Sequence, residues 1–500
     1  MNGSLMEATD KQVNPHISEP LSAKVIKGGV WIFAFRIINR GLGLVRTVVL
    51  AHLLAPQDFG LFGIGMLAIA TLETFSQTGF QAALIQKKEN VEAYLDTAWT
   101  VSAIRGLLLF IILICSAPLI AAFFNSPQAT LVVKVIAIST LLSGFGNIGI
   151  LFFQRELEFH KQFIYEFSAT LIDLTTALFL ALVLRNFWAL VYAGLAANFI
   201  RFLSSYILHP YRPRISFQKE KVQELLAYGK WVFASSVLIF LITQGDDIFV
   251  GRILGVTALG IYQMAYLFSN LPATEITHVI SKVTFPAYSK VKDDPERLRE
   301  SYLKVLQLTA FISIPLAGAI FILAPQFTKI FLGTKWLPMV PPVKILVLAG
   351  MIRSLAATTG PVFGGIGKPD IDTKWQIIRF MVLAISIYPL TAAWHMVGTS
   401  FAVLLSISIA TIGFSVMVIK QTSCGVGQFL KYIIFPSINT LLMIVILYFL
   451  TSHYDILTYY NFFLILIVAS VIYIISTYLL DRSFNYNIRK LLAEILIYIT

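Results

Sequence analysis

Charged residues are scarce in this 500-residue chain, where Asp, Glu, Lys and Arg together make up 13% of the sequence. Hydrophobic residues make up 57%, and the mean hydropathy is +0.79. These values exclude a string of soluble domains and place the chain in the membrane class. The only cysteines, Cys115 and Cys424, lie far apart in sequence, which argues against a disulfide, a metal site or a catalytic thiol.

Other signals are also missing. The chain has no GxxxxGK[ST] phosphate-binding loop, so we expect it to have no ATPase activity of its own and to need no cofactor. Residues 1–20 are polar and lack the apolar core of a secretory signal peptide, so we expect none. The loops predicted to face outward are too short to hold a catalytic domain, which argues against an enzyme.

What the chain does contain is a series of apolar stretches, each long enough to cross the roughly 30 Å hydrocarbon core of a bilayer. They predict an all-α integral membrane protein with about fourteen transmembrane helices. The stretches lie near residues 28–50, 59–85, 96–123, 131–152, 163–184, 187–208, 231–251, 259–285, 305–324, 339–360, 376–393, 399–419, 432–450 and 460–480.

The loop charges support this count. Twenty-four Lys and Arg residues lie in the termini and loops that should face one side, whereas the opposite loops hold only Arg185, Arg252, Lys329 and Lys335. Cytoplasmic loops are enriched in basic residues, so we expect both termini to be cytoplasmic. Most of the net charge of +12 is then explained by topology, and we expect no nucleic-acid partner.

The sequence is internally duplicated. Residues 28–62 recur without a gap at 228–262, with six identical positions at an offset of 200, including Gly60 and Gly260. Each copy contains six predicted helices, an even number, so both copies enter the membrane in the same orientation. This predicts two six-helix lobes related by a pseudo-two-fold axis along the membrane normal.

The duplication divides the chain into six predicted parts. These are a cytoplasmic N-terminus (1–27), an N-lobe (28–208), a basic cytoplasmic linker (209–230), a C-lobe (231–419), two further helices (420–480) and a cytoplasmic amphipathic tail (481–500). The end of the tail is either an interfacial helix or a frayed terminus.

The first predicted helix differs from the others because it carries several arginines within an apolar span. An arginine at the bilayer centre costs roughly 2.5–3.5 kcal/mol, yet this helix carries three. At about 100° per residue, Arg46, Asn39, Gly43, Arg36, Thr47 and Arg40 share one sector of about 120°. Two explanations remain open: ion pairs with Glu73, Glu166 or Asp173, or a water-filled cavity that binds an anion.

Other buried charges are weaker candidates. Arg353 is a further candidate for binding the anion, while Arg379 lies near the end of its predicted span and is expected to snorkel to the interface. Glu73, Asp246 and Asp247 are candidates for coupling to an ion or for ion pairs. Glycines and prolines at 341–342 and 358–370 could permit bending or backbone exposure. A duplicated membrane protein with unlike buried charges in its halves is typical of a transporter.

Several motifs resemble the Wzx-type polysaccharide flippases of the MATE-like MOP exporter superfamily, close to the colanic-acid and teichuronic-acid exporters. The stretches that carry the resemblance are GLGLVRTVVLAHLLAPQDFGLFGIG (41–65), GFQAALIQKKE (79–89), FFQRELEF (152–159), GRILGVTALGIYQMAY (251–266), VTFPAYSKVKDDPERL (283–298) and LGTKWLPMVPPVKIL (332–346).

This resemblance implies a function. A member of this family would flip oligosaccharide repeat units, linked to undecaprenyl pyrophosphate, across the bacterial inner membrane for surface or exopolysaccharide synthesis. The headgroup is anionic, so Arg36, Arg40, Arg46 and Asn39, with Arg353, are the candidates to bind it. The partners implied are the lipid-linked oligosaccharide, membrane lipids, a coupling ion (H+ or Na+), and the polysaccharide polymerase and chain-length proteins.

Three rival functions remain. A MATE-type drug or cation antiporter would need an acidic, aromatic cavity, and the arginines of the first helix argue against one. A polysaccharide polymerase or ligase would need a large outward loop with catalytic residues, which is absent from the prediction. A peptidoglycan-precursor flippase fits the same arginines and stays open.

Overall fold

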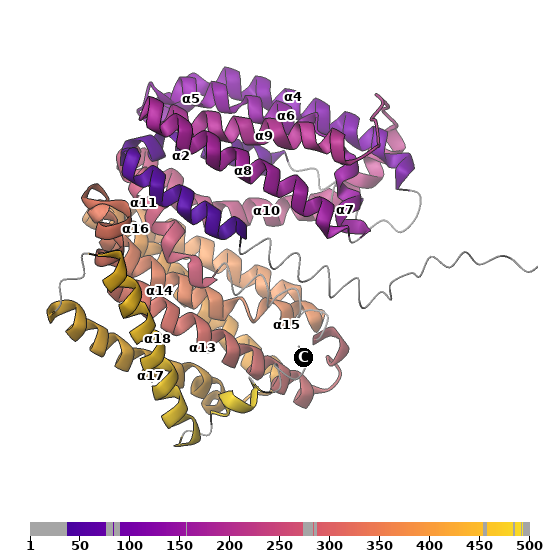
Figure 1. The fold of residues 1–500 in the computed structure, drawn as a ribbon. Helices are drawn as coiled ribbons and strands as arrows, with labels where there is room; N and C mark the ends of the chain where they lie inside the picture. Colours follow the sequence, from indigo (N-terminus) through magenta and orange to yellow (C-terminus); the bar gives the residue numbers. More distant parts are fainter. Residues whose placement is uncertain are drawn as a thin grey trace, which may run out of the picture.

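The computed structural model describes residues 38–76, 84, 91–156, 158–273, 284, 288–453, 458–483, 486–491 and 493, and within these ranges it is helical with no strand (Figure 1). Nine helices in the described residues are long and apolar enough to cross a membrane. The bent pair Ala129–Gly144 and Ile148–Arg155, at 70°, makes a tenth. The all-α membrane fold is therefore confirmed, while the count of fourteen stays a prediction because several expected spans fall partly outside the described ranges.

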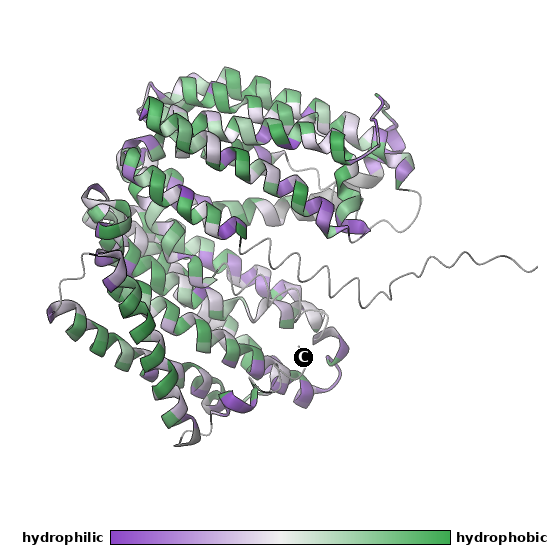
Figure 2. Cartoon of the chain, viewed as in Figure 1, coloured by the Kyte–Doolittle hydropathy of each residue, from purple (hydrophilic) through white to green (hydrophobic). Residues whose placement is uncertain are grey.

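The N-lobe begins, in the described residues, with a helix over 38–53. Its other elements are α2 (Pro56–Phe75), α4 (Glu92–Phe123), α5 (Ala129–Ile136), α6 (Ile138–Gly144), η1 (Ile148–Ile150), α7 (Leu151–Arg155), α8 (Phe159–Leu184) and α9 (Trp188–Leu208). Their middle parts are hydrophobic, and the hydrophilic residues lie mainly at helix ends and loops (Figure 2).

The C-lobe follows along the chain and lies beside the N-lobe (Figure 1). Its elements are α10 (Lys219–Ile253), α11 (Val256–Ser269), α13 (Pro295–Phe327), η2 (Thr328–Leu332), η3 (Thr334–Met339), α14 (Val340–Ala356), α15 (Gly360–Gly365) and α16 (Pro369–Thr422). The helix of α10 starts at Lys219, well before the apolar stretch at 231, because the basic linker continues into residues that favour a helix.

The two lobes meet where α2 crosses α11, and the contact is reciprocal. A Cβ atom on Gly60 would lie 1.9 Å from the Val256 carbonyl oxygen, and one on Gly260 would lie 2.0 Å from the Pro56 carbonyl oxygen. These four residues form two pairs at the offset of 200. Equivalent residues contact each other in this way near a two-fold axis, which confirms the predicted relation between the copies. Only glycine allows the two backbones to come so close.

A break within α16 separates two of the predicted spans. Trp394 and His395 have non-helical backbone angles, and His395 has a positive φ of 51°. Gly398 follows at once, and a Cβ there would lie 1.8 Å from the Leu390 carbonyl oxygen. The chain therefore turns tightly at 394–395, within the predicted gap between residues 393 and 399.

The two groups of helix-breaking residues behave differently from each other. Pro341 and Pro342 occupy the first turn of α14, where proline is tolerated because the first helical N–H groups have no partner within the helix. They therefore start a helix. The glycines and prolines of 358–370 do interrupt the chain, at the boundaries of the short helix α15.

The last two helices, α17 (Val426–His453) and α18 (Tyr459–Ser483), pack against α13 on the outer side of the C-lobe (Figure 1). The Tyr473 hydroxyl donates to the Phe311 carbonyl at 3.0 Å, and Gly318 makes room for Thr440. The start of the tail is also docked: the ring of Tyr486 stacks on Phe435 with centroids 4.1 Å apart.

The linker between the lobes is attached to the N-lobe. The Tyr211 hydroxyl and the backbone N–H of Arg214 both donate to Asp96 of α4. The ring of His209 stacks on Phe152, with centroids 5.7 Å apart. Burial and hydrogen bonding to Asp96 raise the pKa of Tyr211. The first part of the linker is thus part of the N-lobe.

Candidate functional site

Arg46, on the helix 38–53, forms an ion pair with Asp173 of α8. Its Nη2 donates to Oδ1 at 3.1 Å and its Nε lies 2.7 Å from Oδ2. The two side chains are only 19% and 23% exposed, and pairing offsets much of the cost of removing their charges from water. Of the two explanations for the arginines of the first helix, the ion pair applies to Arg46. The pair uses one edge of the guanidinium, and Nη1 makes no contact with a carboxylate among the described residues.

Two further arginines of the N-lobe also have partners within that lobe. Arg201 of α9 lies 3.5 Å from Glu166 of α8, and it also interacts electrostatically with Asp173. Arg105 of α4 donates to the Ser76 carbonyl at 2.9 Å and to the Glu73 carbonyl at 3.1 Å. In the part of the chain that the structure describes, Arg105 is the cation that acts on Glu73.

The other predicted residues of the first helix are less well placed by the structure. Arg36 lies outside the described residues. Arg40 is half-buried, and Asn39 has a buried Oδ1 with no hydrogen-bond partner in the described ranges. Their role in binding an anion therefore stays a prediction.

The C-lobe contains a second group of buried charges around two adjacent aspartates of α10. Asp246 is 1% exposed, and its Oδ2 accepts a hydrogen bond of 2.8 Å from the Tyr262 hydroxyl of α11. The Oδ2 atom of Asp247 accepts a bond of 3.3 Å from Gln263. The Oδ1 atoms of both aspartates are buried with no hydrogen-bond partner among the residues that the structure describes.

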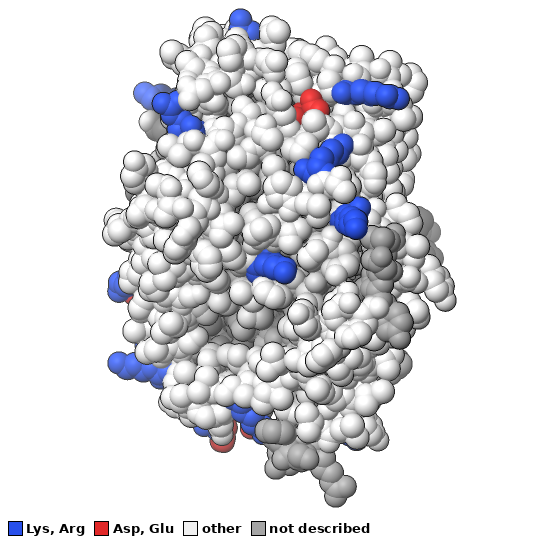
Figure 3. All heavy atoms as spheres, turned by 90° about the vertical axis from the view of Figure 1, so that its left-hand side faces the viewer, with Lys and Arg blue, Asp and Glu red and all other residues white. Residues whose placement is uncertain are grey.

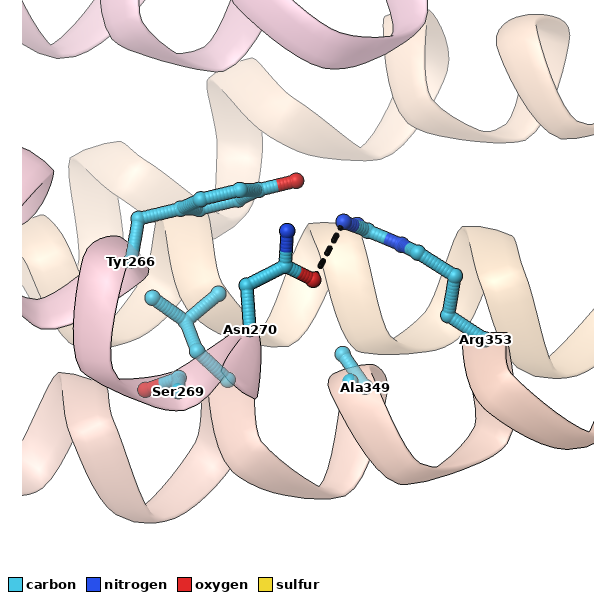
Figure 4. A pocket seen from close by; sticks show the side chains of 7 residues that line it. Tyr266, Ser269, Asn270, Ala349 and Arg353 are labelled. Atoms are coloured by element: carbon cyan, nitrogen blue, oxygen red, sulfur yellow. Dashed lines mark hydrogen bonds between the residues drawn. The ribbon is translucent and has the colours of Figure 1, made fainter. Parts of the chain in front are cut away.

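Arg353 lies in a pocket between α11 and α14. Its Nη1 donates to the Asn270 Oδ1 at 2.9 Å, and its guanidinium carbon lies 5.3 Å from the centre of the Tyr266 ring. Figure 4 shows the guanidinium pointing toward Tyr266 and Asn270. The remaining lining residues are Ser269, Leu346, Ala349 and Gly350. Arg353 interacts electrostatically with Asp246.

Arg379 of α16 is another buried cation of the C-lobe, and sequence reasoning missed its burial. Because α16 begins at Pro369, Arg379 lies about 15 Å along the helix and not at its end. It is 8% exposed, so the expectation that it snorkels to the interface is wrong. It interacts electrostatically with Arg353, Tyr266 and Asp246. The one available signal was Pro369, which marks an earlier start of the helix.

Gln263 connects the aspartates to the contact between the lobes. Its amide donates to Asp247, and its Oε1 would lie 2.2 Å from a Cβ on Gly63 of α2. Gly63 and Gln263 are another pair at the offset of 200. The side chain of Gln263 thus connects Asp247, a candidate coupling residue, to the surface where the lobes meet. Among the described residues, no group of three or more His, Cys, Asp and Glu side chains could hold a metal ion.

A family model described as polysaccharide biosynthesis protein matches residues 49–341. The match covers more than half of the chain and includes parts of both lobes. The chain belongs to this family. The resemblance drawn from the sequence motifs is therefore confirmed.

Several curated proteins are similar to this chain over most of its length. The chain is 27% identical over 365 residues to the lipopolysaccharide biosynthesis protein WzxC of Escherichia coli strain K12, covering 72% of this chain and 73% of that protein. It is 24% identical over 472 residues to the succinoglycan biosynthesis transport protein ExoT of Rhizobium meliloti strain 1021, covering 93% of this chain and 94% of that protein. The chain is a multi-pass membrane protein.

Solved structures show the same fold. The lipid II flippase MurJ, in an inward closed conformation, matches with a TM-score of 0.76 and 17% identity, over 92% of this chain and 99% of MurJ. An inward-facing multidrug resistance MATE family transporter of the MOP superfamily matches with a TM-score of 0.62 and 16% identity, over 76% of this chain and 95% of that protein. Together they confirm the predicted all-helical membrane fold.

Proposed function

We propose that this chain flips oligosaccharide repeat units, carried on undecaprenyl pyrophosphate, across the bacterial inner membrane by alternating access. The observation that carries the proposal is the reciprocal contact of Gly60 with Val256 and of Gly260 with Pro56. In a member of a polysaccharide biosynthesis family, two lobes that meet around a pseudo-two-fold axis can separate at one end of the molecule while they close at the other.

The direction of this arrangement follows from the loop charges. With both termini cytoplasmic, the short connections at 54–55 and 254–255 face outward, and the crossing of α2 and α11 closes the outer end. Figure 3 supports this orientation, because the Lys and Arg side chains on that face are isolated on a mostly uncharged surface. Cytoplasmic ends would be richer in basic residues. The proposed location is therefore the bacterial inner membrane with the substrate entering from the cytoplasm.

The pyrophosphate of the substrate would be bound by arginines within the predicted membrane spans. A guanidinium matches phosphate oxygens with two parallel hydrogen bonds, and Arg36, Arg40 and Arg46 share one helix face with Asn39. Among the described residues, the Nη1 atom of Arg46 contacts no carboxylate and the Asn39 Oδ1 has no hydrogen-bond partner, which supports this role on the N-lobe side. Arg353 would contribute from the C-lobe. The substrate would also contact membrane lipids as it passes.

Energy for transport would come from H+ or Na+, with Asp246 and Asp247 as the coupling residues. Their Oδ1 atoms lack hydrogen-bond partners within the described ranges, as expected of groups that take up and release a cation. Because Gln263 touches Gly63 of α2, binding or release of the cation at Asp247 would affect the contact between the two lobes. Glu73 is the weaker candidate, because Arg105 lies close by and donates a hydrogen bond of 3.1 Å to the Glu73 carbonyl.

Replacing Arg36 and Arg40 together with alanine tests the headgroup assignment. The double variant should insert into the membrane at the normal level but export no polysaccharide, because the anion loses two charge-assisted partners. The measurement is surface polysaccharide in a strain that lacks the natural gene and carries the variant. A matched control is Arg297→Ala, an exposed arginine of the C-lobe whose side chain is 76% exposed. Normal export by the double variant would contradict the assignment.

The nearest alternative is a peptidoglycan-precursor flippase, which the fold likeness to MurJ favours. It would complement loss of the host's own precursor flippase, whereas a polysaccharide flippase would not. A drug or cation antiporter, favoured only by the likeness to MATE transporters, would confer drug resistance when expressed. In the proposed function, the polysaccharide polymerase and chain-length proteins would receive the flipped repeat unit on the outer side.

A further inference from the structure

Two of the four basic residues that are expected to face outward bind the opposite lobe. Lys335 of η3 donates through Nζ to the His52 carbonyl at 2.8 Å, and Arg252 of α10 donates through Nη1 to the Phe123 carbonyl. Both donors belong to the C-lobe, and both acceptors lie at helix ends of the N-lobe. Basic residues are rare in outward loops, so these two exceptions need an explanation.

The N-lobe sequence explains why these two carbonyls can accept a hydrogen bond from another lobe. In an α-helix the carbonyl of each residue accepts from the N–H four residues later, and proline has no N–H. Pro56 follows His52 by four positions, and Pro127 follows Phe123 by four. Each carbonyl therefore lacks a donor in its own chain segment, and the C-terminal end of a helix attracts cations.

Trp336 extends the Lys335 contact into the interior. Its Nε1 donates to the Ala51 carbonyl at 2.9 Å, and the N–H of Ala55, four residues on, donates to Asp58 instead. Trp336 and Ala51 are both fully buried, and the Phe59 ring of α2 packs edge-on against the indole with centroids 5.1 Å apart. Such a bond is costly to break without replacement, because a buried polar group is then left without a partner.

The Arg252 contact is more exposed than the Trp336 contact. Arg252 also donates to the Asn125 Oδ1 at 3.1 Å, and its guanidinium carbon lies 5.3 Å from the centre of the Phe123 ring. Interactions of exposed charges contribute little because water competes for them. The buried indole is therefore the stronger of the two connections.

We propose that Trp336, Lys335 and Arg252 form a latch that holds the outer ends of the two lobes together, with Trp336 contributing most. The inference rests on the proposed function for its orientation, in which this end of the molecule faces outward. When the outer end opens, the N-lobe carbonyls leave their C-lobe donors and become accessible to water. The latch then sets the fraction of molecules that are open on the outer side, because its hydrogen bonds stabilise the closed state alone.

Double electron–electron resonance on the full-length chain in detergent measures the distance between the outer ends. The spin labels are attached at Gln128→Cys in the N-lobe and Lys329→Cys in the C-lobe, two exposed positions near this end. The natural cysteines are removed by Cys115→Ser and Cys424→Ser. In this labelled parent, one short distance should dominate.

The latch variants should populate a longer distance. Trp336→Phe combined with Lys335→Met keeps much of the bulk of both side chains and removes both donors. This variant should raise the ratio of long to short distances at least about fivefold, as expected for loss of about one buried hydrogen bond. Arg252→Met should raise the ratio less. The matched control is Arg185→Met, at the exposed C-terminal end of α8, which should leave the ratio unchanged.

An unchanged ratio in the Trp336→Phe and Lys335→Met variant overturns the proposal, and so does an equal rise in Arg185→Met. If the double variant fails to fold, Lys335→Met alone decides: a higher ratio than in Arg185→Met supports the latch, and an equal ratio overturns it. The measurement needs no lipid substrate. A chain that opens as expected but flips no oligosaccharide would therefore contradict the proposed function and leave the latch in place.

Discussion

At the scale of single residues, the two lobes treat their buried charges differently. In the N-lobe, Arg46 and Arg201 are matched by Asp173 and Glu166 of the same lobe. In the C-lobe, Arg353 contacts the uncharged side chains of Asn270 and Tyr266. A charge that is already paired stabilises the lobe, whereas one that lacks its partner is available for a ligand.

The pairing of Arg46 with Asp173 should be visible as coupling in stability. Asp173→Asn and Arg46→Gln should each lower the free energy of unfolding by about 1–3 kcal/mol, because each leaves one mostly buried partner unmatched. The double variant should lose less than the sum of the two single losses. Thermal unfolding in detergent measures all three. Additive losses would show that the two side chains act independently.

His209 predicts a dependence of stability on pH. Burial lowers the pKa of His209 below its usual value of about 6.5, and its Nδ1 accepts a hydrogen bond of 3.2 Å from the Tyr211 backbone N–H. The neutral ring is therefore favoured in the folded state. Its contribution is present above about pH 6.5 and is lost as the pH falls from there toward the lowered value.

The test compares melting temperatures at about pH 7.5 and about pH 5.5. The unmodified chain should lose more stability on acidification than His209→Gln, which cannot titrate at this position. His160, an exposed histidine of the same lobe, provides the matched control, and His160→Gln should behave like the unmodified chain. An equal loss in His209→Gln would refute the role of the histidine.

At the scale of helices, the crossing of α2 and α11 is the element on which the arrangement of the lobes depends. Gly60→Ala would place a methyl group against the Val256 carbonyl oxygen, 1.9 Å from its ideal position. The helices must then move apart, at a cost of about 1–3 kcal/mol typical of overpacking. We expect a lower melting temperature and reduced export.

Gly260→Ala should have nearly the same effect, because the contact is reciprocal. Gly194→Ala on α9 is the control, since a Cβ there meets nothing within 4 Å, and alanine should stabilise this helix by up to about 1 kcal/mol. A Gly60→Ala variant as stable and active as the Gly194→Ala control would show that the close approach of α2 and α11 is not needed.

The sequence was enough to predict the apolar spans and the relation between the lobes, but not which distant side chains contact each other. Apolar length predicted the spans, and the offset of 200 predicted the relation between the lobes, since both depend on local composition. The pairing of Arg46 with Asp173 was one of several options, because 127 residues separate them and only packing decides between carboxylates. Arg379 was misplaced because a span was judged by its apolar residues, whereas its helix begins at Pro369.

At the scale of the whole molecule, the contact between the lobes is connected to the aspartates of α10. Gly63 touches Gln263, and Gln263 donates a hydrogen bond to Asp247, which follows the buried Asp246. Opening of the lobes and binding of a coupling ion would then influence each other. This connection is what alternating access requires, since each ligand must favour one conformation over the other.

The most direct test of flipping uses the purified chain in liposomes that carry a fluorescent undecaprenyl-pyrophosphate oligosaccharide. A quencher that cannot cross the membrane reports how much of the labelled lipid reaches the outer leaflet. With the unmodified chain, nearly all of the label should become accessible, whereas liposomes without protein, or with the Arg36→Ala and Arg40→Ala variant, should stop at about half. If the unmodified chain also stops at half, the chain does not flip this substrate.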